Sequence, residues 1–283
     1  MFIVSGTKRS GTSMWMQVMA AAGLPILGEA FPRNWKTTLA TANPDGFYES
    51  ILRQGVYWRT NPHPRTGNYF MPKDVDGYAV KVFVPGVIRT ERAYISRLLA
   101  NVREWREYEA SIQRLYAMED EQRKKRHPDA PTPYRFPPAY EWWMENFALV
   151  RDITLRRYPA RLMSYDRVLR DPEREVTATL QWLGTGDLKR AIAAVKPHNR
   201  TQVHPRSSAV PSDLAELFDE LYATIDRSDP VNKSLLQQLN QTNKRLLPLI
   251  TDMQTKVAQQ ALRRRPKGRV PDVSGLPGGE PTT

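Results

Sequence analysis

The N-terminal fourteen residues constrain the fold of this chain most strongly. The apolar run Phe2-Ile3-Val4 leads into a polar loop bounded by Gly6 and Gly11, and a good helix-forming segment, residues 14–22, follows and ends at a glycine. This order predicts a β-strand, a loop and an α-helix. The free N–H groups and the positive dipole end of a helix N-terminus attract anions. We therefore predict an anion-binding turn at the start of the chain.

The loop nearly matches the phosphate-binding pattern G-x-x-x-x-G-K-[ST]. Its two glycines have the required spacing and Ser13 fills the last position, but Thr12 stands where the pattern has lysine. In a nucleoside triphosphatase that lysine contacts the β- and γ-phosphates. The cations Lys8 and Arg9 lie inside the loop instead. This predicts a loop adapted to an anion other than a triphosphate, with a glycine-rich turn of solvated side chains as the alternative.

Composition narrows the class of protein. The chain has 283 residues, of which 40% are hydrophobic, enough for one large α/β domain or two small ones with a sizeable core. It contains no cysteine, which excludes disulfides, zinc–thiolate centres and a cysteine nucleophile. We predict a cytoplasmic protein, because neither a signal peptide nor an apolar run of membrane-spanning length is visible.

The formal net charge of +12 indicates anionic partners, which include nucleic acid, membrane surfaces and small molecules. Two dense basic clusters occur, at residues 123–126 and 263–269. A solvated loop and a tail account for both clusters, and a small anionic ligand accounts for part of the remaining charge. We do not expect nucleic acid as the partner, although the charge leaves it open.

Apolar runs and helical patterns alternate along the chain. Strands are predicted at 77–85, 97–102 and 161–165, and helices at 105–118, 140–158, 172–183, 186–195, 212–226 and 231–262. Ser212 is the predicted N-cap of its helix, and Pro248 is predicted to kink or break the last one. Strands that alternate with helices predict an α/β fold, a parallel sheet flanked by helices on both faces, with a helical C-terminal part.

The domain organisation follows from the same pattern. We predict a single domain over residues 1–262, with a charged, proline-rich insertion or lid at 119–138. The pair Trp142-Trp143 is assigned to the core rather than to a ligand platform. Residues 263–283 are basic and rich in glycine and proline, so this tail is predicted to be disordered.

The segment Arg9-Ser10-Gly11-Thr12-Ser13 resembles the 5′-phosphosulfate loop of sulfotransferases, [KR]-S-G-T-[TS]. That family uses 3′-phosphoadenosine 5′-phosphosulfate as sulfuryl donor and has a P-loop NTPase-like fold. The resemblance implies that Arg9 holds the 5′-phosphosulfate and that no metal is required. It implies donor contacts along the whole loop, from Lys8, Arg9, Ser10, Gly11, Thr12, Ser13 and Met14.

Two further segments resemble the same family. Arg103 follows a predicted strand and Ser111 lies eight residues later, as in V-R-[DN]-P-R-[DE]-x-x-x-S, with Trp105 in place of the proline. This resemblance implies that both residues bind the 3′-phosphate of the donor. Residues 164–172 with 182–184 are similar to the family's Y-E-x-L-x-x-[DN]-P…F-L-G, which implies that Tyr165 borders the adenine.

The chain also departs from the family pattern. Met14 replaces the tryptophan that stacks on adenine, and Trp15 lies one place further on. Only Pro266-Lys267-Gly268 is comparable to the family's C-terminal R-K-G, and it lies in the predicted tail. Arg200 and Arg206 are therefore alternative candidates for binding the 3′-phosphate.

The largest departure concerns the general base. Many family members carry Lys-x-His on the second core strand, and here Lys81 matches the lysine while Phe83 occupies the histidine position. Lys81 is predicted to contact the bridging or sulfuryl oxygens of the donor. Glu49, at the end of a turn-rich segment similar to one in bacterial relatives, is the first candidate base and His63 the second. A structural ion pair is the alternative role for Glu49.

These observations predict a sulfotransferase that transfers a sulfuryl group to a hydroxyl or, as second choice, to an amine. The acceptor is a small molecule, lipid or glycan bound by loops within 25–76 and 119–140, and its identity is left open, as is the oligomeric state. Two other classes remain. A P-loop kinase would require Mg²⁺ and a lysine at Thr12, and a non-catalytic polyanion-binding module would show steep salt dependence.

Overall fold

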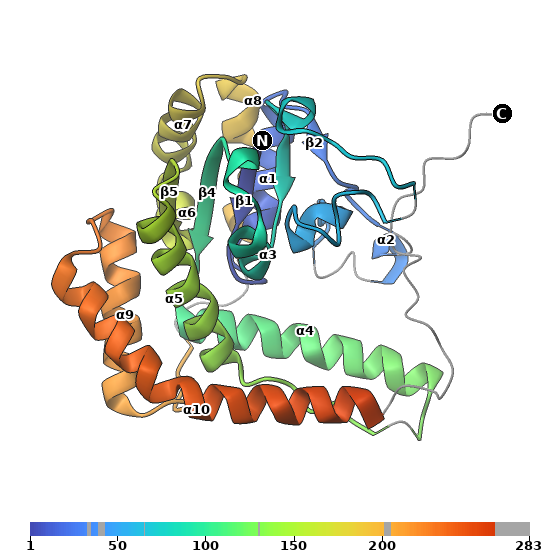
Figure 1. Ribbon diagram of the computed structural model, residues 1–283, viewed down its shortest axis with the longest axis vertical. Helices are drawn as coiled ribbons and strands as arrows, with labels where there is room; N and C mark the ends of the chain where they lie inside the picture. Colours follow the sequence, from blue (N-terminus) through green and yellow to red (C-terminus); the bar gives the residue numbers. More distant parts are fainter. Residues whose placement is uncertain (33–34, 39–42, 65, 130, 201–204, 264–283) are drawn as a thin grey trace.

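The computed structural model describes the whole chain except residues 33–34, 39–42, 65, 130, 201–204 and 264–283. Within that part of the chain, five strands form one parallel sheet in the order β2-β3-β1-β4-β5 (Figure 1). The strands are β1 (Phe2–Ser5), β2 (Ile26–Leu27), β3 (Ala79–Lys81), β4 (Arg97–Val102) and β5 (Ala160–Ser164). The predicted α/β class with a parallel central sheet is confirmed.

Ten α-helices surround the sheet in the described residues. They are α1 (Thr12–Ala21), α2 (Trp35–Thr38), α3 (Val84–Arg89), α4 (Trp105–Arg126), α5 (Pro138–Arg156), α6 (Tyr165–Arg170), α7 (Pro172–Leu183), α8 (Leu188–Ala193), α9 (Ser212–Arg227) and α10 (Lys233–Arg263). Among these helices, none is long and apolar enough to cross a membrane.

Neighbouring side chains of each strand pack on opposite faces of the sheet, so the apolar core has a part on each face. Val4 and Leu99 pack into a cluster with α1, α7 and α8, whereas Ile3 and Leu98 pack into another with α3 and α5. Successive side chains of a strand point to opposite faces, so a strand that is buried on both faces is apolar at most positions. Both faces are therefore covered by helices, as the sequence predicts.

A third cluster joins α4, α5, α9 and α10, which lie below and to the left of the sheet in Figure 1. Trp142 and Trp143 of α5 are fully buried there, and the Trp143 ring stacks on Phe218 with 5.3 Å between centroids. The assignment of this tryptophan pair to the core is confirmed. The helical C-terminal part of the chain thus shares one apolar core with α4 and α5.

Several predicted boundaries are wrong. The strand predicted at 77–85 covers only Ala79–Lys81, because Pro85 lies in the first turn of α3, where a proline needs no hydrogen-bonding N–H. The helix predicted at 105–118 continues to Arg126, so much of the predicted lid at 119–138 is helical. Ion pairs one turn apart, such as Lys125 with Glu121 at 2.8 Å, support this exposed extension.

The start of α9 differs from the prediction. Pro211, not Ser212, occupies the N-cap of α9, and no side chain caps that end. The last helix, α10, is unbroken across Pro248, although it changes direction along its length (Figure 1). The tail predicted at 263–283, including Pro266-Lys267-Gly268, lies outside the described residues apart from Arg263, the end of α10.

Candidate functional site

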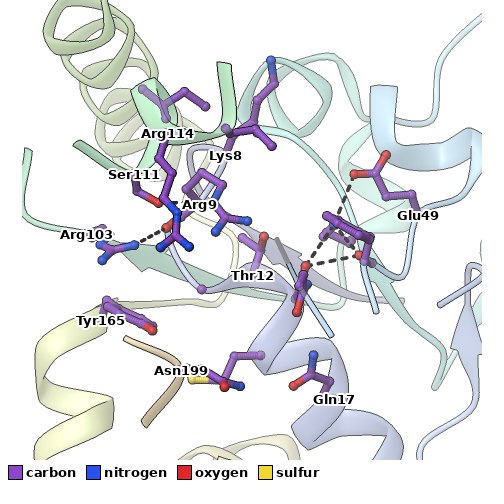
Figure 2. A pocket seen from close by; sticks show the side chains of 18 of the residues that line it. Lys8, Arg9, Thr12, Gln17, Glu49, Arg103, Ser111, Arg114, Tyr165 and Asn199 are labelled. Carbon is purple, nitrogen blue, oxygen red and sulfur yellow. Dashed lines mark hydrogen bonds and ion pairs between the residues drawn. The ribbon is translucent and has the colours of Figure 1, made fainter. Parts of the chain in front are cut away.

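A cavity of about 550 Å³, called here the large cavity, opens where β1, β3 and β4 end. Its lining comes from the β1–α1 loop, from α4, and from segments 43–54 and 196–199 (Figure 2). The carboxyl ends of parallel strands are the usual position for ligands in open α/β sheets, above all where neighbouring connections diverge. Here β1 lies between β3 and β4, so the loop that follows β1 occupies such a point.

The β1–α1 loop is fixed from below by buried contacts. Gly11 is the N-cap of α1 with φ 92°, and a Cβ atom there would lie 2.7 Å from both the Tyr165 ring and Nδ2 of Asn101. Only glycine fits this left-handed, crowded position. The Ser10 hydroxyl donates to the Thr7 carbonyl at 2.7 Å, and the Asn101 amide donates to the Ser10 carbonyl. Ser10 is therefore buried beneath the loop.

The amino end of α1 faces the large cavity. Gly11, Thr12 and Ser13 line it, and the first turn of this ten-residue helix carries no acidic residue. The free N–H groups of this turn therefore have no carboxylate partner on their own helix. Such an end favours an anion both by hydrogen bonding and through the helix dipole.

Three guanidinium groups gather on one side of the large cavity, those of Arg9, Arg103 and Arg114 (Figure 2). The Arg9 Nε donates to the Ser111 hydroxyl at 3.2 Å, and the Arg103 Nη1 donates to the Arg9 carbonyl at 3.2 Å. The structure thus joins the loop to the two residues of the second motif. Burial lowers the pKa of Arg9 most, and the positive charges of Arg103 and Arg114 lower it further.

The positive charge and the hydrogen-bond donors of Arg103 are only partly paired with protein groups. Its Nε contacts Glu107 at 3.3 Å, but Glu107 is shared with Arg200. The Arg103 Nη2 is buried and has no hydrogen-bond partner among the described residues. Arg114, on the exposed side of α4, forms no ion pair within the described chain. Because an orphaned buried donor is costly, this group of arginines favours a bound anion.

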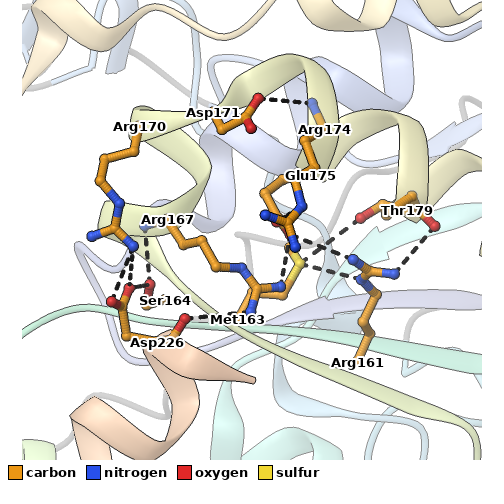
Figure 3. Close-up of polar contacts among 11 residues, drawn as sticks. Arg161, Met163, Ser164, Arg167, Arg170, Asp171, Arg174, Glu175, Thr179 and Asp226 are labelled. Carbon is orange, nitrogen blue, oxygen red and sulfur yellow. Dashed lines mark hydrogen bonds and ion pairs between the residues drawn. The ribbon is translucent and has the colours of Figure 1, made fainter. Parts of the chain in front are cut away.

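Tyr165 closes the same end of the large cavity. Its ring lies 5.0 Å from the Arg103 guanidinium carbon, and burial is the largest cause of its raised pKa. Tyr165 begins α6, whose N-cap Ser164 accepts from the Arg167 N–H at 3.0 Å. Ion pairs of Arg167 and Arg170 with α7 and α9 hold this helix in place (Figure 3).

Lys81 lies at the opposite side of the large cavity, in a compensated environment. Its ammonium is 3.3 Å from Glu49 Oε1 and 3.3 Å from the Ser13 hydroxyl, and it donates to the Phe47 carbonyl. Burial lowers the pKa of Lys81, while Glu49 raises it. Glu49 also pairs with Arg53 at 2.8 Å. These contacts agree with the alternative role predicted for Glu49, a structural ion pair.

Four candidates from the sequence do not line the large cavity, and the buried Ser10 is one of them. His63 lies in a turn, where its Nδ1 accepts from the Thr66 N–H at 3.2 Å. Arg206 is exposed on the segment before α9. Arg200 pairs with Asp166 at 2.7 Å and with Glu107, so its guanidinium is engaged by protein carboxylates.

Other lining residues were not predicted. Arg114 lies one helical turn after Ser111, so the spacing of α4 was a usable signal. Gln17 lies one turn into α1. Lys196 and Asn199 come from the segment after α8, where both contact Asp45, and no local pattern in the sequence marks them. The described residues contain no cluster of three or more side chains of the kinds that ligate metals.

No model of a protein family matches the chain, and no curated protein matches it.

Proposed function

We propose that this protein is a sulfotransferase that uses 3′-phosphoadenosine 5′-phosphosulfate as donor. The observation that carries the proposal is the cluster of Arg9, Arg103 and Arg114 beside the amino end of α1, in one cavity with Tyr165, with the buried Arg103 Nη2 left without a partner among the described residues. The two motifs that resemble donor-binding segments lie 102 residues apart in sequence, yet Arg9 and Ser111 are hydrogen-bonded. A ligand with two separated anionic groups and an aromatic base suits this arrangement.

Each subsite has its own residues in this proposal. Arg9 and the N–H groups of Thr12 and Ser13 would bind the 5′-phosphosulfate. Arg103, with its unpaired Nη2, and Ser111 would bind the 3′-phosphate. The residues present fit the donor, because a guanidinium group lies at each of the two proposed anion subsites of the large cavity.

The donor supplies a sulfuryl group that is activated for transfer. The protein's part is to position the acceptor and to neutralise charge on the leaving phosphate. Arg9 suits the second task, because its guanidinium is held by Ser111 and by burial. Lys81 is rigidly placed by Glu49 and Ser13 and would contact the sulfuryl oxygens.

The P-loop NTPase-like sulfotransferase fold is part of the same proposal. Its support is the β1–loop–α1 unit with β1 inside the sheet, and the parallel neighbours β3 and β4. The missing lysine at Thr12 argues against a triphosphate as the natural ligand.

Calorimetric titration with adenosine 3′,5′-bisphosphate, the product nucleotide, tests the proposal. We expect binding without Mg²⁺ that is at least tenfold tighter than binding of adenosine 5′-monophosphate. Tighter binding of Mg²⁺-ATP than of the bisphosphate would indicate a kinase. Equal binding of unrelated polyanions, with a steep salt dependence, would indicate a polyanion-binding module.

A further inference from the structure

A second, smaller cavity of about 200 Å³ adjoins the large one. The two cavities share Lys8, Gln54 and Phe83 in their linings, so they meet at the end of β3. The small cavity is completed by Gly6, Pro85 and Glu145. Glu145, on α5, brings a carboxyl group to the space beside Phe83, the aromatic residue just beyond Lys81.

Glu145 has an unusual environment for a carboxyl group. It is partly buried, and it forms no hydrogen bond or ion pair with the described residues. Its helical neighbour Glu141 is engaged, since it accepts from the Tyr108 hydroxyl at 2.7 Å and lies 4.0 Å from the Lys8 ammonium. An unpaired carboxyl that borders a cavity is available to a ligand in a way that Glu141 is not.

Burial, with the nearby charge of Glu141, favours the protonated form of Glu145 at neutral pH. Burial raises its pKa most, the charge of Glu141 raises it further, and Lys8 lowers it, to give a value of about 8. On α4, Tyr108 and Tyr116 are near enough to interact electrostatically with the same carboxyl. A base works best when its pKa lies near the working pH, because it then removes a proton readily and is still available in its ionised form.

The comparison with Glu49 identifies the better base. Glu49 holds two cations, Lys81 and Arg53, and taking up a proton would break both ion pairs. Glu145 has no such pairing to lose. Phe83 lies in the lining of both cavities and carries no proton-accepting group. A base that acts beside Phe83 must therefore come from another element, and α5 supplies one.

We propose that Glu145 is the general base that accepts the proton of the acceptor's hydroxyl group. This inference rests on the proposed function. As the proton moves to the Glu145 carboxylate, the acceptor oxygen forms its bond to sulfur. The bond between sulfur and the 5′-phosphate oxygen breaks, and its electron pair leaves with adenosine 3′,5′-bisphosphate. Glu145 then returns the proton to solvent, so the step needs no further reactant.

Acceptors of graded acidity test this role. Transfer rates of the wild type and Glu145→Gln are compared with 4-nitrophenol, phenol and hexan-1-ol, and Glu141→Gln is the matched control one turn away. We expect a loss of about 10²–10⁴-fold with the alcohol, which needs a base. The loss should shrink toward none with 4-nitrophenol, which ionises without help. Equal losses with all acceptors would overturn the proposal, because a structural role does not depend on acceptor acidity.

Two readouts do not depend on turnover. Glu145→Gln should bind adenosine 3′,5′-bisphosphate as the wild type does. Because the folded-state pKa of Glu145 exceeds its ordinary value of 4.5, folding favours the protonated carboxyl, and the wild type loses stability as the pH rises from about 4.5 to 8. Glu145→Gln lacks this loss. The melting temperature of the variant, relative to that of the wild type, should therefore rise between pH 5 and pH 8. No gain would contradict the assigned environment.

The cysteine-free chain allows access to Glu145 to be measured directly. In Glu145→Cys, with the bisphosphate bound, a small methanethiosulfonate should modify the thiol, as it does in the exposed control Glu121→Cys. An unreactive thiol at 145 would overturn the proposal. Failure of the wild type to bind the bisphosphate would instead overturn the proposed function, so the two failures are distinguishable.

Discussion

The two sides of the large cavity differ in how completely their charged side chains are paired. Around Lys81, every charged group has a partner, since Glu49 lies between the ammonium and Arg53. On the side of Arg9, Arg103 shares Glu107 with Arg200, and the Arg103 Nη2 is left without a partner in the described chain. A cation that is paired with a carboxylate needs no ligand for stability. A cation that lacks such a partner stabilises the fold further when an anion binds to it. The second side is therefore the one that we propose binds the anionic ligand.

The largest expected effect on stability comes from removing the carboxylate that pairs with Lys81. Glu49→Gln leaves the Lys81 ammonium buried without its counter-charge, and we expect a loss of about 3–5 kcal/mol in the free energy of unfolding. Denaturant unfolding measures this loss. The control is Arg53→Gln, which removes the more exposed of the two cations that pair with Glu49. Normal stability with a 10²-fold loss of turnover would instead restore Glu49 as the candidate base.

On the other side of the large cavity, Arg9→Ala should lower the rate of sulfuryl transfer by about 10²-fold or more, the usual cost of losing a donor to developing charge. Lys8→Ala is the control, because its side chain is half exposed and 4.0 Å from Glu141. We expect a much smaller effect there, measured as kcat/KM for the donor. Equal losses in the two variants would mean that the loop has been misaligned with the family motif.

Arg103→Ala should weaken nucleotide binding by about 1.5–3 kcal/mol, as expected for a charge-assisted contact. The effect should fall on adenosine 3′,5′-bisphosphate and spare adenosine 5′-monophosphate, because only the first carries the 3′-phosphate. Calorimetry with both ligands gives the comparison. A parallel loss for both nucleotides would remove Arg103 from the 3′-phosphate subsite.

Arg114→Ala should have the smallest effect. The side chain is exposed, so salt screens its interaction with the donor, and we expect less than a tenfold loss of affinity at physiological ionic strength. The loss should grow as salt is lowered, whereas the exposed neighbour Gln113→Ala should show no such trend. A loss as large as that of Arg9→Ala would place Arg114 in direct, desolvated contact with the ligand.

The sequence predicted best those helices and strands whose ends carry capping residues, proline or glycine. The strand β4 and the helix α7 begin and end where predicted, since α7 has Asp171 and Pro172 at its start and Gly184 after its end. The extension of α4 to Arg126 was missed, because its last turns are charged, exposed and without an apolar period. Such a helix depends on ion pairs and on its continuity with the buried turns before it.

The site was predicted only where a motif contained it. Arg9, Arg103, Ser111 and Tyr165 were identified in sequence and line one cavity in the structure. His63 was chosen for its chemistry alone, and its turn lies outside the lining. Arg200 was read as a phosphate ligand, but Glu107 and Asp166 engage it, and that pairing depends on how α4 and α6 meet.

The sequence by itself determined the strand–loop–helix at the amino terminus, the parallel α/β sheet and several of the residues that line the large cavity. These features depend on short-range spacing, on glycine and on apolar periodicity, which are local properties of the chain. Only the tertiary structure decided which charges are compensated. It paired Glu49 with Lys81, left the Arg103 Nη2 without a partner, and brought Glu145 of α5 beside Phe83. Compensation depends on distances between elements far apart in sequence, and packing of helices against the sheet sets those distances.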